Sequence, residues 1–289
     1  MKRLSMLLLT AIVVMAAGSA FAGHVENVNC LSAEYAMTSA RTGATDAADI
    51  AMYNPAGTVF LPNNGLFISF TMQFVWKEFE NEYAGNTYEQ DKPSYVPSLS
   101  LVYRHDDWAG FFIVNPPAGT GSVDWENGSA TTAQMIDKIV AGARALAAGN
   151  AASGPITIYN QSIEASSTYI GFTLGGAYKL TDWLSLSVAG RYITSKREVK
   201  ASARFNADIT IAPDTTTVDL ASDFEYEANG YGAIFGINIR PLQNLNIGLR
   251  YETVTRMEFE YSTNRRTVSV TDGEGMATAG LGAGILADL

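Results

Sequence analysis

Strict alternation of apolar and polar residues is the strongest pattern in the chain. In GLFISFTMQFVWK, every second residue from Leu66 to Trp76 is apolar, and most residues between them are polar. The same period of two recurs in YIGFTLGGAYK, WLSLSVAGRY, YGAIFGINIR and LNIGLRYE. Because successive side chains of a strand point to opposite faces, these segments are predicted strands with one apolar face. We expect seven strands, at 65–78, 94–104, 108–115, 163–179, 183–197, 222–240 and 244–261, and the start of an eighth near 277–286.

The predicted connections alternate in length. Tight turns are expected near 105–107, 181–182 and 241–244, and long polar connections at roughly 80–92, 115–160, 198–221 and 262–277. Segments of about ten residues are long enough for a tilted strand to cross a bilayer. Aromatic residues such as Trp76, Trp108 and Tyr178 lie near segment ends. A soluble sandwich also alternates, but the sorted loops favour an all-β transmembrane antiparallel barrel.

The first 22 residues have the organisation of a secretory signal peptide. Lys2 and Arg3 precede an apolar run from Leu7 to Ala17, and Ala20-Phe21-Ala22 fits a small-x-small cleavage site. A retained membrane anchor is the poorer interpretation, because the apolar run is short for a spanning helix. With the barrel pattern, this predicts a multi-pass protein of the bacterial outer membrane, cleaved near Ala22.

Composition removes several functional classes. The chain has 19 basic and 29 acidic residues and a net charge of −10, and loss of Lys2 and Arg3 with the leader makes it −12. Nucleic acid is therefore not an expected partner, since its binding needs clustered Lys and Arg. Cys30 is the only cysteine, which excludes an intramolecular disulfide. A soluble exported domain, an exported enzyme and an outer-membrane barrel remain.

The stretch DIAMYNPAGTVFLPN, residues 49–63, does not fit the strand pattern. Asn54-Pro55-Ala56-Gly57 lies at its centre, and two prolines and two asparagines argue against a long helix or a central strand. The stretch is nevertheless too apolar for a solvated linker. It is either a simple turn before the first strand or a compact, irregular plug.

One helix is predicted within the long connection 115–160, over 131–148. Thr131 and Gln134 are in capping-box positions, and Gly149 follows the last turn. Met135, Ile139 and Leu146 share an apolar stripe. The stripe either packs on its own loop or forms a patch that captures an apolar ligand.

Catalytic chemistry is not indicated. The chain has two histidines, His24 and His105, and neither belongs to a nucleophilic constellation. No spacing typical of metal ligands or of a nucleotide cofactor is present, so we expect no enzyme activity, metal or cofactor. An outer-membrane lipid-modifying enzyme remains the alternative from another class.

Several stretches in this order resemble the FadL/TodX family of outer-membrane transporters of long-chain fatty acids and aromatic hydrocarbons. They are SARTGATDAADIAMYNPAGTVFL, GFFIVNPPAGTGSVDW, SIEASSTYIGFTLGGAYKLTDWLSLSVAGRYI and GYGAIFGINIRPLQNLNIGLRYETVTRMEF. The resemblance covers nearly all of the chain after the leader. It implies that residues 23–63 form an N-terminal hatch and 64–289 part of the barrel wall. The family barrel has fourteen strands, so the chain resembles an N-terminal portion; a closed eight-stranded barrel is the rival.

The resemblance also implies a function. It is the passive uptake of hydrophobic small molecules by a monomer in outer-membrane lipid, with capture at outer loops and lateral release. Asn115, Pro116, Pro117 and Gly119 are the candidate lateral opening, because two prolines break sheet pairing. The alternative is that the strand simply ends there.

Strand parity predicts the residues that face inward. The candidate ligand-lining residues are Phe67, Phe111, Ile113, Arg104, Arg191 and Arg250. The arginines either meet a ligand carboxylate or balance inward acids such as Glu252. A general polar porin is the main rival that is not an enzyme, and the apolar inward residues argue against it.

Overall fold

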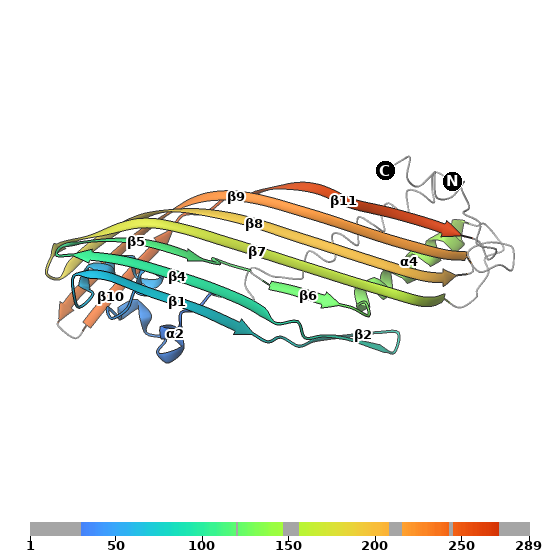
Figure 1. Cartoon of the computed structure of the whole chain (residues 1–289), viewed down its shortest axis with the longest axis horizontal. Helices are drawn as coiled ribbons and strands as arrows, with labels where there is room; N and C mark the ends of the chain where they lie inside the picture. The colour runs from blue at the N-terminus through green and yellow to red at the C-terminus, as the bar shows by residue number, and fades with distance from the viewer. Residues whose placement is uncertain (1–29, 120, 147–155, 208–215, 243–244, 272–289) are drawn as a thin grey trace.

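The protein folds mainly as one curled antiparallel sheet. The computed structural model describes residues 30–119, 121–146, 156–207, 216–242 and 245–271 (Figure 1). Nine strands form the sheet: β1 (Gly65–Val75), β4 (Ser94–His105), β5 (Trp108–Asn115), β6 (Gly121–Trp125), β7 (Ile156–Thr181), β8 (Leu184–Ala207), β9 (Thr216–Leu242), β10 (Leu245–Glu252) and β11 (Glu258–Thr271). Their order is β1-β4-β5-β7-β8-β9-β10, with β6 also on β7 and β11 also on β9. The predicted all-β antiparallel class is confirmed.

Three strands are longer than the sequence pattern predicted. The expected connection 198–221 is mostly strand, because β8 continues to Ala207 and β9 begins at Thr216. In this region charged residues such as Lys200 and Arg204 alternate with buried Val199 and Ala203. The prediction was wrong because it treated the outward charges as loop polarity, whereas they belong to one solvated face of a strand.

The expected single strand 244–261 is two strands, and its continuation at 262–271 is strand rather than loop. β10 and β11 both pair with β9 and are separated by residues 253–257. These residues cross over Gly230 and Gly232 of β9. A Cβ on Gly230 would lie 2.6 Å from Thr255 Cγ2 and 2.8 Å from the Arg256 carbonyl oxygen. Glycine in β9 therefore leaves room for the irregular crossing.

Two other expected loops also contain regular structure. The connection 80–92 includes a separate hairpin of β2 (Phe79–Tyr83) and β3 (Asn86–Gln90). The connection 115–160 includes β6, the start of β7 and the helix α4 (Ala130–Leu146). The helix begins one residue earlier than predicted, and its capping residues are Ser129 and Thr132 rather than Thr131 and Gln134. Ser129 Oγ accepts from the Thr132 amide, and Thr132 Oγ1 accepts from the Ser129 amide.

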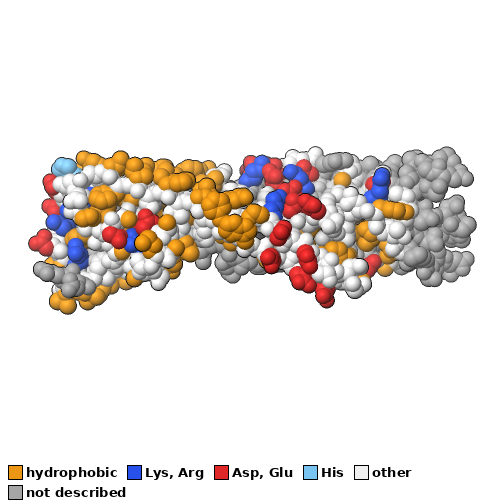
Figure 2. Space-filling view, turned by 60° about the horizontal axis from the view of Figure 1, so that its bottom comes forward, with side chains coloured by type: hydrophobic (Ala, Val, Ile, Leu, Met, Phe, Trp, Pro, Cys, Tyr) orange, Lys and Arg blue, Asp and Glu red, His pale blue; other side chains and the backbone are white. Residues whose placement is uncertain are grey.

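The two faces of the sheet differ in chemistry. The convex face exposes apolar side chains over about half its length, where Figure 2 shows them gathered, and charged side chains over the middle part. The exposed apolar residues include Leu66, Ile68, Phe70, Phe74, Leu174, Val188, Tyr231, Phe235 and Leu249. The charged part carries ion pairs such as Lys196 with Glu225 and Arg204 with Asp219. Parity correctly predicted these faces.

The concave face holds a segment of short helices, residues 30–63, which we call the inner segment. It contains α2 (Ala33–Met37), η2 (Arg41–Gly43), α3 (Ile50–Tyr53) and η3 (Pro55–Phe60). Ile50, Val59 and Leu61 are fully or almost fully buried against apolar side chains of the sheet. The inner segment thus replaces solvent on one end of the concave face (Figure 1).

Among the described residues the sheet is open. β1 pairs with β4 alone, and β10 and β11 pair with β9 alone. The predicted eighth strand near 277–286 and the leader lie outside the described residues. Counted across the sheet, seven strand positions are present. Two of them each hold two successive strands: β5 and β6 lie end to end beside β7, and β10 and β11 lie end to end beside β9.

Gly230→Ala should destabilise the fold. The added methyl group meets Thr255 and backbone of residue 256 at less than 3 Å, so we expect a loss of about 1–3 kcal/mol. Gly190→Ala in β8 is the matched control, because no heavy atom lies within 4 Å of its Cβ position. Unfolding midpoints in a denaturant titration make the comparison. Equal midpoints would mean that residues 253–257 do not pack on β9.

Candidate functional site

The side chain of Asn54 forms hydrogen bonds both within the inner segment and to the sheet. This side chain is completely buried. Nδ2 donates to the Thr42 carbonyl oxygen at 2.9 Å and to Asn238 Oδ1 at 2.6 Å, while Oδ1 accepts from the Gly57 amide at 3.2 Å. Pro55 begins η3, where its missing N–H leaves no donor to satisfy. The Asn-Pro-Ala-Gly run therefore organises a buried helical turn rather than an exposed turn.

The sheet is shaped to receive this turn. Ser185 Oγ donates to the Ala56 carbonyl oxygen at 2.5 Å. A Cβ on Gly236 would lie 3.1 Å from Pro55 Cγ, and a Cβ on Gly248 would lie 2.6 Å from Asn54 Cγ. Small inward residues of β8, β9 and β10 thus let the backbone of the inner segment approach closely.

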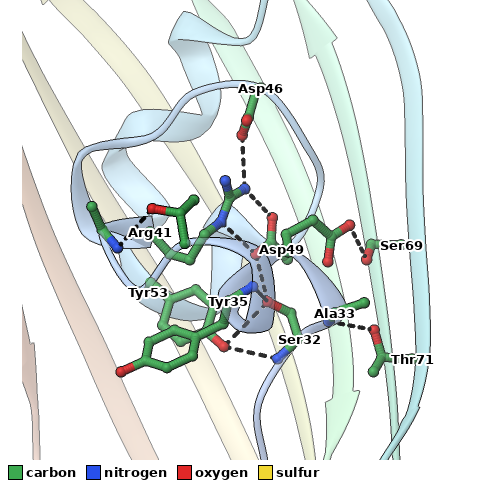
Figure 3. A network of polar contacts seen from close by, with 12 residues as sticks. Ser32, Ala33, Tyr35, Arg41, Asp46, Asp49, Tyr53, Ser69 and Thr71 are labelled. Atoms are coloured by element: carbon green, nitrogen blue, oxygen red, sulfur yellow. Dashed lines mark hydrogen bonds and ion pairs between the residues drawn. The ribbon is translucent and has the colours of Figure 1, made fainter.

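A buried ionic network holds the beginning of the inner segment to its centre (Figure 3). Arg41 Nη2 lies 2.5 Å from Asp49 Oδ1 and 2.7 Å from Asp46 Oδ1, and Arg41 and Asp49 are each 1% exposed. Ser32 Oγ donates to Asp49 Oδ2 at 2.7 Å, and the Tyr53 hydroxyl accepts from the Ser32 amide. The hydrogen bond from Arg41 lowers the pKa of Asp46. Loss of one partner of such a pair leaves a buried charge uncompensated.

The first described residues run along the inward polar side chains of β1. The Leu31 amide donates to Gln73 Oε1 and the Ala33 amide to Thr71 Oγ1, each at 3.1 Å. Ser69 Oγ donates to the Glu34 carboxylate at 2.9 Å. The polar residues that alternate in GLFISFTMQFVWK therefore satisfy the inner segment.

Cys30 lies at the end of this run. Its thiol is beside Ser98 of β4 and Asn115 of β5, and burial raises its pKa. The inner segment therefore reaches the place where β5 ends.

The three apolar residues predicted to line a ligand pack against the inner segment. Phe111 and Ile113 are 3% and 1% exposed and belong to one cluster with Ile50, Val59 and Leu61, and Phe67 packs at its edge. In this arrangement the inner segment occupies the position that a ligand was predicted to take.

The three predicted inward arginines also have partners within the chain. Arg191 and Arg250 both bind the carboxylate of Glu252, Arg191 also donates to Thr173 Oγ1, and Arg104 donates to the Leu61 carbonyl oxygen at 2.5 Å. The alternative in which inward arginines balance an inward acid agrees with the contacts of Arg191 and Arg250, whereas Arg104 meets a backbone carbonyl.

The chain leaves the sheet at Pro116-Pro117 and returns to the same neighbour. Asn115, the last residue of β5, pairs with Gly171 of β7, and Gly121, the first of β6, pairs with Ser167. Among the described pairs, residues 168–170 of β7 have no partner on the side that faces β5 and β6, although they pair with β8 on the other side. Pro117 packs on Gly171, and Gly119 has φ of 47°, a left-handed conformation that suits glycine. The prolines thus interrupt the pairing with β7, which resumes with β6.

The helix α4 packs on the concave face at the other end of the sheet. Met135, Ile136 and Val140 are buried with Phe205 and Leu220 in one apolar cluster. One alternative placed Met135 in an exposed patch that captures a ligand. That alternative is wrong for Met135, because its side chain is buried. The side chains of Ile139 and Leu146 lie outside the described residues.

Comparison with known proteins gives no assignment: no family model, curated protein or solved structure matches the chain. Within the described residues, no helix is long and apolar enough to span a membrane. No group of His, Cys, Asp and Glu in this part of the chain is arranged to hold a metal ion.

Sequence reasoning missed Asn238, Ser185 and the glycines that receive the inner segment. Asn238 was readable only as a polar residue opposite the apolar Ile237 and Ile239 in YGAIFGINIR. Its partner Asn54 is 184 positions away, so no local pattern joins them.

Asn54→Ala should loosen the inner segment. It removes three hydrogen bonds and leaves the Gly57 amide and the Thr42 carbonyl oxygen without that partner, so we expect a loss of about 1–3 kcal/mol. Limited proteolysis should then cleave within residues 30–63 faster than in the parent protein. Asn63→Ala, which alters an exposed side chain, is the control. Unchanged cleavage in Asn54→Ala would contradict the anchoring role of Asn54.

Proposed function

We propose that the protein is an outer-membrane channel for the passive uptake of hydrophobic small molecules, with lateral release into the membrane. The observation that carries the proposal is the exposed apolar convex face. A continuous apolar surface of this kind marks a contact with lipid or with another macromolecule. On a β-sheet that alternates with a polar concave face, it fits the outside of a transmembrane barrel.

The placement of aromatic residues supports a membrane orientation. Phe172, Tyr192 and Tyr231 adjoin one another on the convex face, and Trp183 marks the other end of the apolar region. Tyr192 and Trp183 are nine residues apart, which is about 30 Å along a strand and near the ~25 Å apolar band after tilting. The charged parts of β7, β8 and β9 then extend beyond the membrane.

The inner segment supports a plugged channel. Its irregular backbone would be costly in contact with lipid, and is tolerated where protein surrounds it. The resemblance to the FadL/TodX family assigns residues 23–63 the same role of hatch, and long-chain fatty acids or aromatic hydrocarbons as the substrates. In this proposal the wall is a portion of a fourteen-stranded barrel.

The break at Pro116-Pro117 is the proposed exit. A wall position without backbone pairing must be lined by protein or ligand, and Cys30 of the hatch lies directly beside it. Movement of the hatch would therefore change the surroundings of the break. A general polar porin does not explain a hatch packed by Ile50, Val59 and Leu61 against the wall, and a soluble exported enzyme does not explain the exposed apolar face.

A charge on the apolar face should be costly only in a membrane. We expect Val188→Arg, on a side chain 58% exposed, to lower the free energy of unfolding in lipid vesicles by about 2–4 kcal/mol. Ser262→Arg, on the charged part of the convex face beside Glu225, should change it little. The two variants are compared by folding titrations into vesicles. Equal effects would exclude the proposed membrane position.

A tether at the break should inhibit uptake. Ser98 and Asn115 are next to the paired residues Leu99 and Val114, at the end of the β4–β5 ladder nearest the break. Both lie beside the Cys30 thiol. We would form a Ser98→Cys/Asn115→Cys disulfide in a Cys30→Ser background and measure vesicle uptake of a fatty acid, a toluene-like solute and a sugar. Uptake of the hydrophobic solutes should fall on oxidation and recover on reduction, and the sugar should not enter.

The control tether joins Tyr103→Cys to Gly110→Cys, a pair of the same two strands away from the break. Unchanged uptake with the Ser98–Asn115 tether formed would place the exit elsewhere. Sugar uptake equal to that of the hydrophobic solutes would favour the porin.

A further inference from the structure

A row of polar and positively charged side chains borders the break on the concave face. Gly121 of β6 pairs with Ser167 of β7, and Ser167 pairs with Arg197 of β8. Lys77 and Ser94 lie against the same glycine: a Cβ there would be 2.9 Å from Lys77 Nζ and 3.5 Å from Ser94 Oγ. We call Lys77, Ser94, Ser167 and Arg197 the rim row.

The rim row has unused hydrogen-bonding capacity. Ser94 and Ser167 are 3% and 6% exposed, and neither hydroxyl has a hydrogen-bond partner within the described part of the chain. Arg197 Nε is also buried without a partner there. A buried polar group left unpaired costs about 1–3 kcal/mol, so a ligand that binds beside these three groups and the two cations gains hydrogen bonds that the chain does not make.

The two cations of the row lack carboxylate partners among the described residues. Lys77 takes part in no ion pair there, whereas Lys92 on the other face binds Asp124 and Glu164. Arg197 donates to the Tyr169 hydroxyl, and its guanidinium lies 5.4 Å and 4.8 Å from the ring centres of Tyr169 and Phe259. The rings fix the guanidinium without neutralising it.

We propose that the rim row binds the carboxylate or sulfate head of an amphiphile whose apolar tail follows the break in the wall. Every free group in the row can donate a hydrogen bond and two of the side chains are cationic, and oxyanions accept charge-assisted hydrogen bonds from such groups. A neutral hydrocarbon leaves all of them unpaired. The inference rests on the proposed function, in which the break is the exit, and it adds a charge preference at that exit.

The test compares three ligands of one tail length. The full chain in phosphatidylcholine nanodiscs is titrated with labelled dodecanoate, dodecyl sulfate and dodecanol, and binding to empty nanodiscs is subtracted. The parent protein should bind the two anions at least about tenfold more tightly than dodecanol, a difference of about 1.4 kcal/mol. Lys77→Met should remove most of this preference without weakening dodecanol, and Lys77→Arg should retain it.

Two further variants guard against a folding effect. Lys200→Met removes an ammonium from the convex face and should leave all three affinities unchanged. Gly121→Ala places a methyl group between Lys77 and Ser94 and should weaken the anions alone. Acetate, which has the head without the tail, should compete only at far higher concentration than dodecanoate.

Equal binding of dodecanol and dodecanoate by the parent protein would overturn the proposal. So would an unchanged preference in Lys77→Met, an equal loss of all three ligands, or displacement by acetate as effective as by dodecanoate. These results are separate from the proposed function, because a channel that takes up a toluene-like solute without any charge preference retains the function and lacks only the rim site. Absence of hydrophobic uptake would instead reject the function itself.

Discussion

Irregular backbone on the concave face is tolerable only because its polar groups find partners inside the protein. Asn54 meets this requirement most completely, since one amide group satisfies the inner segment at two points and the sheet at a third. Ser185 and the side chains of β1 satisfy further backbone groups. The glycines opposite Asn54 and Pro55 follow from the same constraint, because these bonds need a close approach.

Charge is distributed by the same requirement. On the convex face, oppositely charged residues alternate between adjacent strands and remain accessible to water, as Lys196 and Glu225 do. On the concave face, two arginines that are shielded from water are each paired with a carboxylate: Arg41 with Asp49, and Arg191 with Glu252. Lys77 and Arg197 form no ion pair among the described residues, and both lie beside the interruption of the sheet at Pro116-Pro117.

Periodicity in the sequence predicted the strands and their faces because a period of two depends only on local geometry. The segment 108–115 matches β5 at both ends. The ends of β7, β8 and β9 were not predicted, since their outward charges resemble loop polarity when the solvated face is not known. The division of β10 from β11 depends on Gly230, which lies on another strand. The site was predicted in its motif, Asn54 to Gly57, but not in its partners, because Asn238 is brought to Asn54 only by the folded sheet.

The uninterrupted strands have a consequence for internal motion. β7, β8 and β9 are 26, 24 and 27 residues long and pair with one another along almost their full length. On either side of these three strands, a neighbouring position is broken, once at Pro116-Pro117 and once at residues 253–257. The three long strands therefore form a rigid, continuously paired unit, and the sheet is interrupted on both sides of it. Amide hydrogens in the middle of β8 should exchange with solvent only on global unfolding, whereas those next to the two interruptions exchange through local opening. The sheet can thus flex at two defined lines while its central strands keep their register.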